Sequence, residues 1–234
     1  MNVSVVVATY GSEEWARLGQ ERAYPSALDQ GAHEIVVGHD PEGTVSSVRN
    51  SLAEKTSGDW LCFLDGDDEL GPGYLEAMRR AFEREGRTDG VPLLLTPAVS
   101  YVRGSKRRTP PRIWPEVPFE RGNWLVIGTL LPRDLFFSVG GFRDYGDPPG
   151  STGYEDWSLW ARCYLAGAQV VKVPRAVYVA YWQASSRNHN ADASTRLRWH
   201  YEIGRDLFPD LYDEGWIDRH LPRQPRPLRR SRVR

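Results

Sequence analysis

Apolar runs alternate with amphipathic stretches along the first hundred residues. The runs are nearly continuous in apolar and β-branched residues, which is typical of strands covered on both faces. The predicted strands are 3–9, 34–38 and 60–64. The stretches between them carry helix-start signals, including a capping-box-like Ser12 and a threonine N-cap at Thr44. The predicted helices are 12–30, 44–56 and 71–84. The resulting β-α-β-α-β-α order indicates an α/β fold with a mostly parallel central sheet flanked by helices.

The second half of the chain is less regular. Short apolar runs predict further strands at 93–99, 125–131, 170–173 and 177–181. A helix is expected over 155–166, where Gly167 ends it. The proline-rich stretch 103–124 is too long for an ordinary connection, so we expect a loop that is either functional or mobile.

Composition narrows the function classes. Lys and Arg total 30 against 31 Asp and Glu, a formal charge of -1, so no overall basic charge favours nucleic acid. No apolar run approaches the roughly 20 residues of a membrane span. The N-terminus resembles a strand more than a signal peptide, and Cys62 and Cys163 lie in apolar stretches typical of buried thiols. We therefore expect a cytoplasmic protein without disulfides.

The chain length suits a single domain, expected over 1–221. Residues 222–234 are rich in arginine and proline and contain no acid, which predicts a disordered basic tail. Such a tail most often aids solubility. Peripheral contact with anionic lipid is the alternative.

The clearest chemical signal is an apolar strand that ends in a cluster of carboxylates. Residues 61–64 run into Asp65, Gly66, Asp67 and Asp68. Ligands of open α/β sheets gather at the carboxyl ends of strands, and carboxylates there can hold a hard divalent cation and, through it, a diphosphate. The alternative is an ordinary polar turn, for which Asp-Gly is sufficient.

The arrangement resembles the Asp-X-Asp motif of family 2 glycosyltransferases, the inverting GT-A enzymes that use nucleotide-sugars. Further segments match that family in the same order along residues 3–187. They are Thr9-Tyr10 after the first strand, Asp40 after the second, Arg49-Asn50 on the helix before the motif, the Gly-Gly-Phe segment containing Gly141, and Glu155-Asp156-Trp157. The resemblance implies a GT-A fold, with 1–100 as the nucleotide-binding half and 101–221 as the acceptor half.

The resemblance also implies roles for individual residues. Asp156 is the expected general base, which takes a proton from the acceptor hydroxyl. Asp65, Asp67 and His189 are the expected ligands of Mn²⁺ or Mg²⁺. His189 takes the place of a family histidine where this chain has Gln183, although a histidine in such a polar loop is more often a solvated surface residue. Donor contacts are expected from Thr9, Tyr10, Asp40, Arg49, Asn50, Asp65 and Gly66, and acceptor contacts from Gly141, Glu155 and Trp157.

The expected reaction transfers a sugar from a nucleoside-diphosphate sugar, by default a UDP-sugar, to a hydroxyl. The acceptor class stays open among a glycan, a lipid-linked sugar, a small molecule and a protein. Tryptophans can stack on sugars or fill the core. Trp157 and Trp160 share a helix face typical of core, whereas Trp114 in the long loop favours the acceptor site.

Other readings of the same residues remain open. Glu155-Asp156 can be an ordinary acidic first helical turn, favoured by the helix dipole. An Asp-X-Asp phosphatase usually places its motif after the first strand, and a nucleotidyltransferase needs a basic glycine-rich loop that residues 8–14 lack. A non-catalytic subunit that binds nucleotide or sugar is the remaining alternative.

Overall fold

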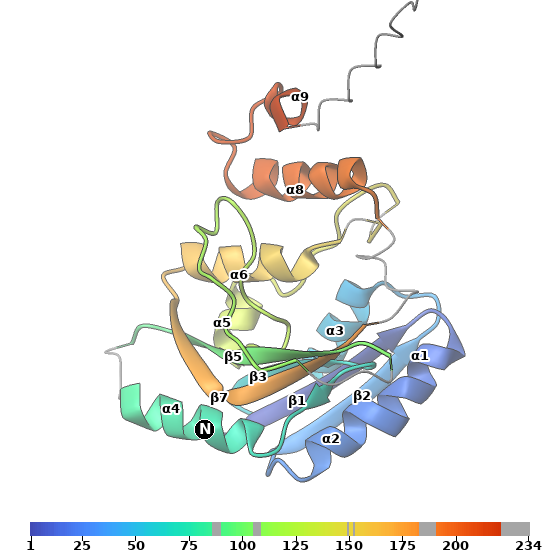
Figure 1. Ribbon diagram of the computed structural model, residues 1–234, viewed down its shortest axis with the longest axis vertical. Coiled ribbons are helices and arrows are strands. Elements are labelled where there is room, and N and C mark those ends of the chain that lie inside the picture. The colour runs from blue at the N-terminus through green and yellow to red at the C-terminus, as the bar shows by residue number, and fades with distance from the viewer. Residues whose placement is uncertain (86–89, 105–108, 149, 152, 183–190, 221–234) are drawn as a thin grey trace, which may run out of the picture.

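The computed structural model describes residues 1–85, 90–104, 109–148, 150–151, 153–182 and 191–220. Its first sheet contains the predicted parallel strands in the order β2-β1-β3-β6. These strands are β1 (Val3–Tyr10), β2 (Glu34–Asp40), β3 (Trp60–Asp65) and the short antiparallel β6 (Leu131–Pro132). Because β1 pairs in parallel with both β2 and β3, the carboxyl ends of all three meet at one edge (Figure 1).

Helices cover this sheet as the pattern predicts, with one interruption. The stretch predicted as one helix is α1 (Glu13–Leu18), a π-helical turn η1 (Gly19–Ala23) and α2 (Tyr24–Leu28). Ser12 precedes α1 without a side-chain cap, so the predicted capping box there is wrong. Thr44 does cap α3 (Val45–Glu54), where Thr44 and Ser47 exchange bonds in a capping box. The helix α4 (Tyr74–Glu85) follows β3.

A second sheet joins the later part of the chain to the first half. Its order is β4-β7-β5, with β4 (Glu69–Leu70), β7 (Gln169–Tyr181) and β5 (Leu93–Val102). The strands predicted at 170–173 and 177–181 are one strand, β7, whose pairing with β5 shifts register between Pro97 and Ala98.

The strand predicted at 125–131 is wrong, because only Leu131 and Pro132 form β6. Side-chain hydrogen bonds and one backbone bridge hold residues 125–130 instead. The Leu125 N–H donates to Asn123, Thr129 bonds Thr96, and Leu130 makes an isolated bridge to Leu95. Leu125 and Leu130 are fully buried, so an apolar run here fills the core without a ladder.

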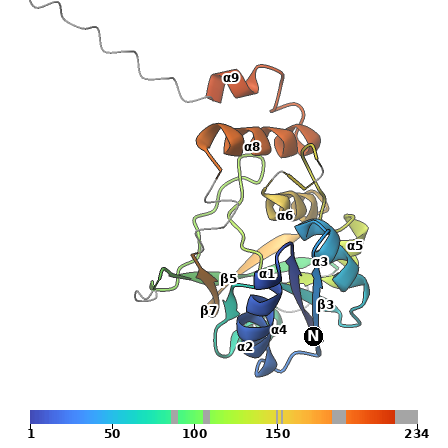
Figure 2. The same ribbon diagram turned by 90° about the vertical axis from the view of Figure 1, so that its right-hand side faces the viewer.

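The remaining helices stack above the sheets. These helices are α5 (Arg133–Ser138), α6 (Glu155–Leu165), α8 (Ala193–Leu207) and α9 (Trp216–His220). Figures 1 and 2 show α8 and α9 as an outer layer on the far side of α6 from the strands. The sequence analysis did not predict α8. Asp192 caps this helix, and Trp199 and Ile203 lie on its buried face.

The core joins these layers. Phe63 of β3 packs against Phe136 and Phe142, with ring centroids 5.3 and 4.9 Å away. Cys62 and Cys163 are buried free thiols, as predicted. Within the described residues, no helix has the length and apolar character needed to cross a membrane.

Candidate active site at the strand ends and the start of helix α6

The carboxyl ends of β1, β2 and β3 bring three predicted site residues to one edge. Tyr10 lies opposite Asp40, and Ala8, two residues before Tyr10, lies opposite Asp65. Asp40 is exposed, and its Oδ1 accepts the Glu42 N–H at 3.0 Å. This edge is where parallel sheets bind ligands.

Thr9 packs against Gly66 of the turn after β3. Its side chain is buried, and its hydroxyl donates to the Gly38 carbonyl at 3.2 Å. A Cβ on Gly66 would lie 2.4 Å from the Thr9 methyl carbon, so only glycine fits above it. Contact of Thr9 and Gly66 with a donor remains a prediction.

The three aspartates of the turn after β3 lie in different environments. Asp68 points into the protein, where its Oδ1 accepts the Tyr181 N–H at 2.8 Å, and burial raises its pKa well above the usual value. Burial, followed by repulsion from Asp65, raises the pKa of Asp67 to about 7. Among the described residues, therefore, no cation fully offsets the burial of Asp67, whereas Asp65 is paired with Arg49.

The donor set suits a hard divalent cation. Asp65 and Asp67 supply carboxylate oxygens, which Mg²⁺ and Mn²⁺ prefer, and such ions take further ligands from water and substrate phosphates. His189 and Gln183 lie outside the described residues. Among the residues that are described, no group of three His, Cys, Asp or Glu side chains converges as a metal site. Asp65 and Asp67 remain the predicted protein ligands.

Arg22 is a site residue that the sequence analysis missed. Its Nη1 donates to the Asp67 carbonyl at 2.7 Å, and its guanidinium lies 4.0 Å above the Tyr181 ring. Arg22 belongs to the π-helical turn η1, and such turns are frequent at functional sites. Since helical periodicity alone does not reveal a π-turn, the sequence offered no signal for it.

Arg49 links the two halves of the site. Its Nη2 donates to Asp65 Oδ1 at 2.6 Å and its Nη1 to Glu155 Oε1 at 2.9 Å. Burial would lower the pKa of this guanidinium, but Asp65 and Glu155 raise it further, so it stays charged. The predicted donor residue Arg49 therefore joins the Asp-X-Asp turn to helix α6.

Asn50 and Gly141 form a second link. The Asn50 amide donates to the Phe142 carbonyl and accepts the Phe142 N–H, both at 2.9 Å. Gly141 has φ +61°, and a Cβ there would lie 2.6 Å from the Asn50 amide oxygen. Both ends of the Asn50 amide are thus used on the Gly-Gly-Phe turn, and its predicted contact with the donor remains a prediction.

Asp156 lies half-buried at the start of α6. Its Oδ2 accepts the Asn123 amide at 2.9 Å and its Oδ1 the Trp157 N–H at 2.7 Å. Burial and then Glu155 raise the pKa of Asp156 to about 7, against the opposing effect of Arg49. Tyr154, one residue before Glu155, has φ 67°, a strained conformation for a side-chain-bearing residue.

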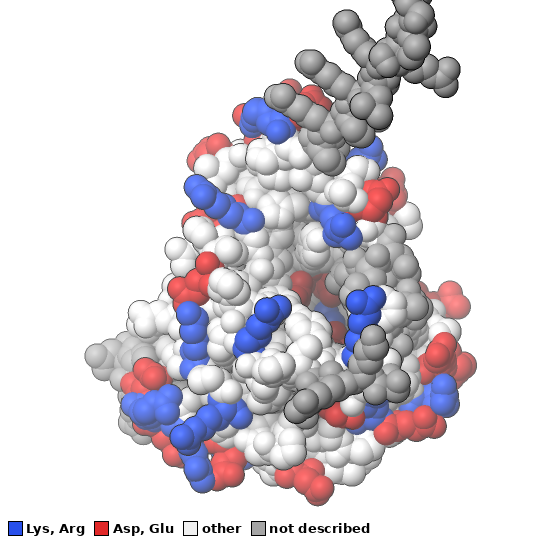
Figure 3. Space-filling view, in the orientation of Figure 1, with Lys and Arg blue, Asp and Glu red and all other residues white. Residues whose placement is uncertain are grey.

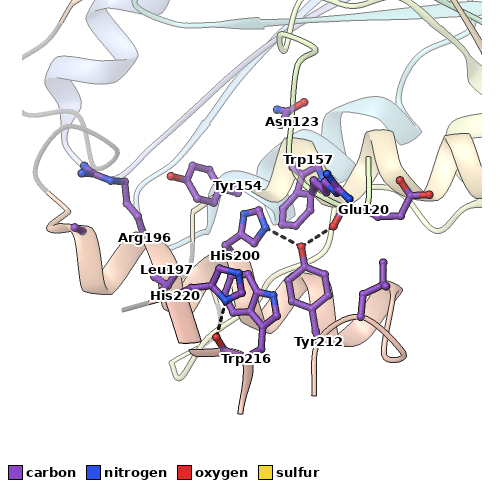
Figure 4. A pocket seen from close by; sticks show the side chains of 14 residues that line it. Glu120, Asn123, Tyr154, Trp157, Arg196, Leu197, His200, Tyr212, Trp216 and His220 are labelled. Atoms are coloured by element: carbon purple, nitrogen blue, oxygen red, sulfur yellow. Dashed lines mark hydrogen bonds between the residues drawn. The ribbon is translucent and has the colours of Figure 1, made fainter. Parts of the chain in front are cut away.

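A cavity of about 930 Å³ opens beside Asp156. Asn123 lines it, so the amide that holds Asp156 also faces the cavity (Figure 4). The sequence analysis missed Asn123, because a loop asparagine carries no spacing signal. Figure 3 shows acidic side chains at the floor of a hollow on this face of the molecule.

The predicted aromatic contacts divide between cavity and core. Trp157 is only 1% exposed and its indole N–H donates to the Phe119 carbonyl at 2.9 Å, so it forms the back of the cavity wall. Trp160 is fully buried, as predicted. Trp114 packs partly buried against the core and does not line this cavity.

Comparison with known proteins gives consistent matches. The family model described as glycosyl transferase family 2 matches residues 21–144. The succinoglycan biosynthesis protein ExoM of Rhizobium meliloti is 25% identical over 180 residues, which cover 74% of this chain and 54% of ExoM. The chain therefore spans about half the length of that curated relative.

Solved structures of Staphylococcus aureus TarS share the fold. TarS 1–349 in complex with UDP-GlcNAc matches with a TM-score of 0.57 and 18% identity, over 88% of this chain and 65% of that one. A longer TarS structure matches with a TM-score of 0.55 and 18% identity, over 86% of this chain and 39% of TarS. The predicted α/β class of GT-A type is confirmed.

Proposed function

Because the chain belongs to glycosyl transferase family 2, whose model matches residues 21–144, we propose that it transfers a sugar from a UDP-sugar to a hydroxyl acceptor, with inversion at the anomeric carbon. The UDP-sugar is supported by the shared fold of TarS, which binds UDP-GlcNAc. Membership of this family argues against the alternative that the chain is an Asp-X-Asp phosphatase.

One observation carries the proposal. Arg49 ties Asp65 of the Asp-X-Asp turn to Glu155, and Glu155 is next to Asp156, a carboxylate whose pKa is about 7. Charge-stabilising groups for a departing diphosphate and a base for an incoming hydroxyl therefore lie on two sides of one site.

The residues divide the chemistry between them. Asp156, held by Asn123, takes the proton of the acceptor hydroxyl as its oxygen bonds to the anomeric carbon. The bond from that carbon to the diphosphate oxygen breaks at the same time. Attack from the face opposite the diphosphate inverts the configuration. A pKa near 7 suits a base that works at neutral pH.

The donor side is arranged to receive negative charge. Asp65 and Asp67 would hold a divalent cation, which neutralises the diphosphate as it leaves. Arg22 fixes the Asp67 backbone through its bond to the carbonyl. The position of Asp40 and Tyr10 at the ends of β2 and β1 supports their proposed contact with the nucleoside.

Calorimetric titration tests the donor half. We expect UDP to bind in the presence of Mn²⁺ or Mg²⁺ more tightly than GDP or dTDP, and Asp67→Ala to weaken that binding. Binding that does not respond to any cation would contradict the metal-dependent form of the proposal.

Turnover tests the catalytic half. UDP release from UDP-GlcNAc and other UDP-sugars, with water or an added glycan as acceptor, should be lost in Asp156→Asn while UDP still binds. A wild-type chain that binds UDP but turns over no UDP-sugar would favour the non-catalytic alternative.

A further inference from the structure

We propose that the cavity between α6, α8 and α9 binds the acceptor, and that this acceptor is a glycan carrying a carboxylate or phosphate on a sugar next to the one that reacts. The inference rests on the proposed function. It adds a substrate class and a binding site built from helices outside the matched residues 21–144.

The inner end of the cavity lies at the base. Asn123 faces the cavity and donates to Asp156 at 2.9 Å. Tyr154, on the same wall, precedes Glu155 and holds a left-handed backbone conformation with φ 67°. Strain of this kind persists where surrounding structure fixes it, often at ligand sites. We place the reacting hydroxyl at Asn123, the residue that bonds Asp156, with the rest of the molecule extending along the cavity toward α9.

The walls suit a sugar chain. The volume of about 930 Å³ falls near the top of the usual range for ligand sites, and it exceeds the needs of one hexose. One wall is a continuous aromatic stack in which the centroids of Trp157 and His200 are 4.4 Å apart, those of His200 and Trp216 5.4 Å, and those of Trp216 and His220 4.1 Å. Figure 4 shows these rings side by side along the cavity. Because these rings cover one another's faces, the wall presents mainly their apolar edges, against which the C–H groups of a sugar can pack.

The charge of the cavity comes from two arginines. Arg196 is half-buried on α8, and its Nη1 donates to the Ala191 carbonyl at 2.7 Å. Arg121 lies on the loop that forms another wall. Within the part of the chain that the structure describes, neither guanidinium has a carboxylate within ion-pair distance, so both are available to an anion.

The carboxylates at the inner end decide where the anion lies. Asp156 and Glu155 would repel a negative group on the reacting sugar itself. The charge therefore belongs on a neighbouring sugar, farther out along α8, where Arg196 is placed. This position separates the recognition of charge from the chemistry.

Titration of the full chain with defined saccharides tests the proposal. The carboxylate probe is maltobionate, in which a neutral glucose is joined to gluconate. The phosphate probe is maltose 1-phosphate, in which a neutral glucose is joined to a glucose phosphate. Maltotriose is the neutral control. Binding is followed by calorimetry and by the NMR signals of the tryptophan indoles. Each preparation is first titrated with UDP and Mn²⁺, so that failure of the donor site is detected separately.

We expect at least one anionic probe to bind roughly 5-fold more tightly than maltotriose, as one partly exposed ion pair supplies. Arg196→Gln should remove that preference. Arg121→Gln, at an exposed loop position where folding is not at risk, should reduce it. Arg175→Gln, an exposed arginine that lines a different depression beside α4, is the matched control and should not change it.

Each result has a definite meaning. Preference for maltobionate alone or maltose 1-phosphate alone supports the proposal and identifies the anion. Equal binding of all three probes, or a preference that survives both substitutions, overturns it. Absence of binding at the highest soluble concentrations, in a chain that binds UDP, also overturns it. A chain that fails to bind UDP contradicts the proposed function instead.

Discussion

Removal of the Arg49 guanidinium should destabilise the protein through the charges it leaves behind. In Arg49→Met the side chain keeps much of its apolar bulk, while Asp65 and Glu155 lose their shared cation. Breaking a fully buried pair from one side costs about 3–5 kcal/mol. Arg49 and Glu155 are only 5% and 14% exposed, but Asp65 is 36% exposed and partly solvated, so we expect a loss of about 2–4 kcal/mol in the free energy of unfolding.

Urea unfolding and calorimetry at pH 7 measure this loss. For a chain of this size it corresponds to a fall of about 5–12 °C in Tm. Arg143→Met is the matched control, because Arg143 pairs with Asp206 at 3.3 Å with both side chains more than 40% exposed. An exposed pair of that kind contributes less than about 1 kcal/mol.

A variant that keeps the charge separates charge from packing. Arg49→Lys retains a cation near Asp65 and Glu155, so it should recover part of the loss seen in Arg49→Met. An unfolding free energy of Arg49→Met within about 1 kcal/mol of wild type at pH 7 would refute the reasoning. A loss of equal size in Arg49→Lys and Arg49→Met would refute it as well, since that result indicates packing.

Three further predictions concern the base, the Asp-X-Asp turn and its support. Because the pKa of Asp156 is raised to about 7, kcat/KM should rise with pH and level off above pH 7. Over the same pH range the protein should lose stability, because the desolvated carboxyl ionises. Asp156→Asn should remove the pH-dependent activity and reduce the loss of stability, the rest of which comes from Asp67 and Asp68. Activity profiles against pH and urea unfolding at pH 5 and 8 measure the two effects. Gly66→Ala places a methyl against Thr9 and should weaken UDP binding by about 10-fold, with recovery in the double variant Gly66→Ala/Thr9→Ser, which lacks the clashing methyl. Arg22→Met should weaken Mn²⁺-dependent UDP binding by a similar factor, whereas Arg17→Met on the exposed face of α1 should leave the calorimetric Kd unchanged.

Local patterns predicted the strands that carry the donor side. The runs that became β1, β2 and β3 are apolar enough to be buried on both faces, and parallel pairing then brings their carboxyl ends together. That rule is sufficient to place Tyr10, Asp40 and Asp65 at one edge. The same rule wrongly predicted a strand at 125–131, because a buried apolar segment does not have to pair with a neighbouring strand.

Long-range contacts set the rest of the site. Arg49 and Glu155 are 106 positions apart, and Asn123 and Asp156 are 33 apart, so no local periodicity predicts either pair. The resemblance to family 2 named Arg49 and Glu155, but it did not reveal that they bond to each other. Asn123 and Arg22 were missed because a single polar residue in a loop or helix has no distinguishing pattern.

The distribution of one positive charge among several acids explains how Asp156 serves as a base. Arg49 bonds Asp65 and Glu155 directly and reaches Asp156 only through space. The two bonded carboxylates share its charge, whereas the partners of Asp156 among the described residues are the amide of Asn123 and the N–H of Trp157. Neutral donors stabilise an ionised carboxyl less than a cation does. Burial therefore dominates at Asp156 and holds its pKa near 7. Had the guanidinium bonded Asp156 instead, its pKa would be lower and it would be a weaker base toward a hydroxyl.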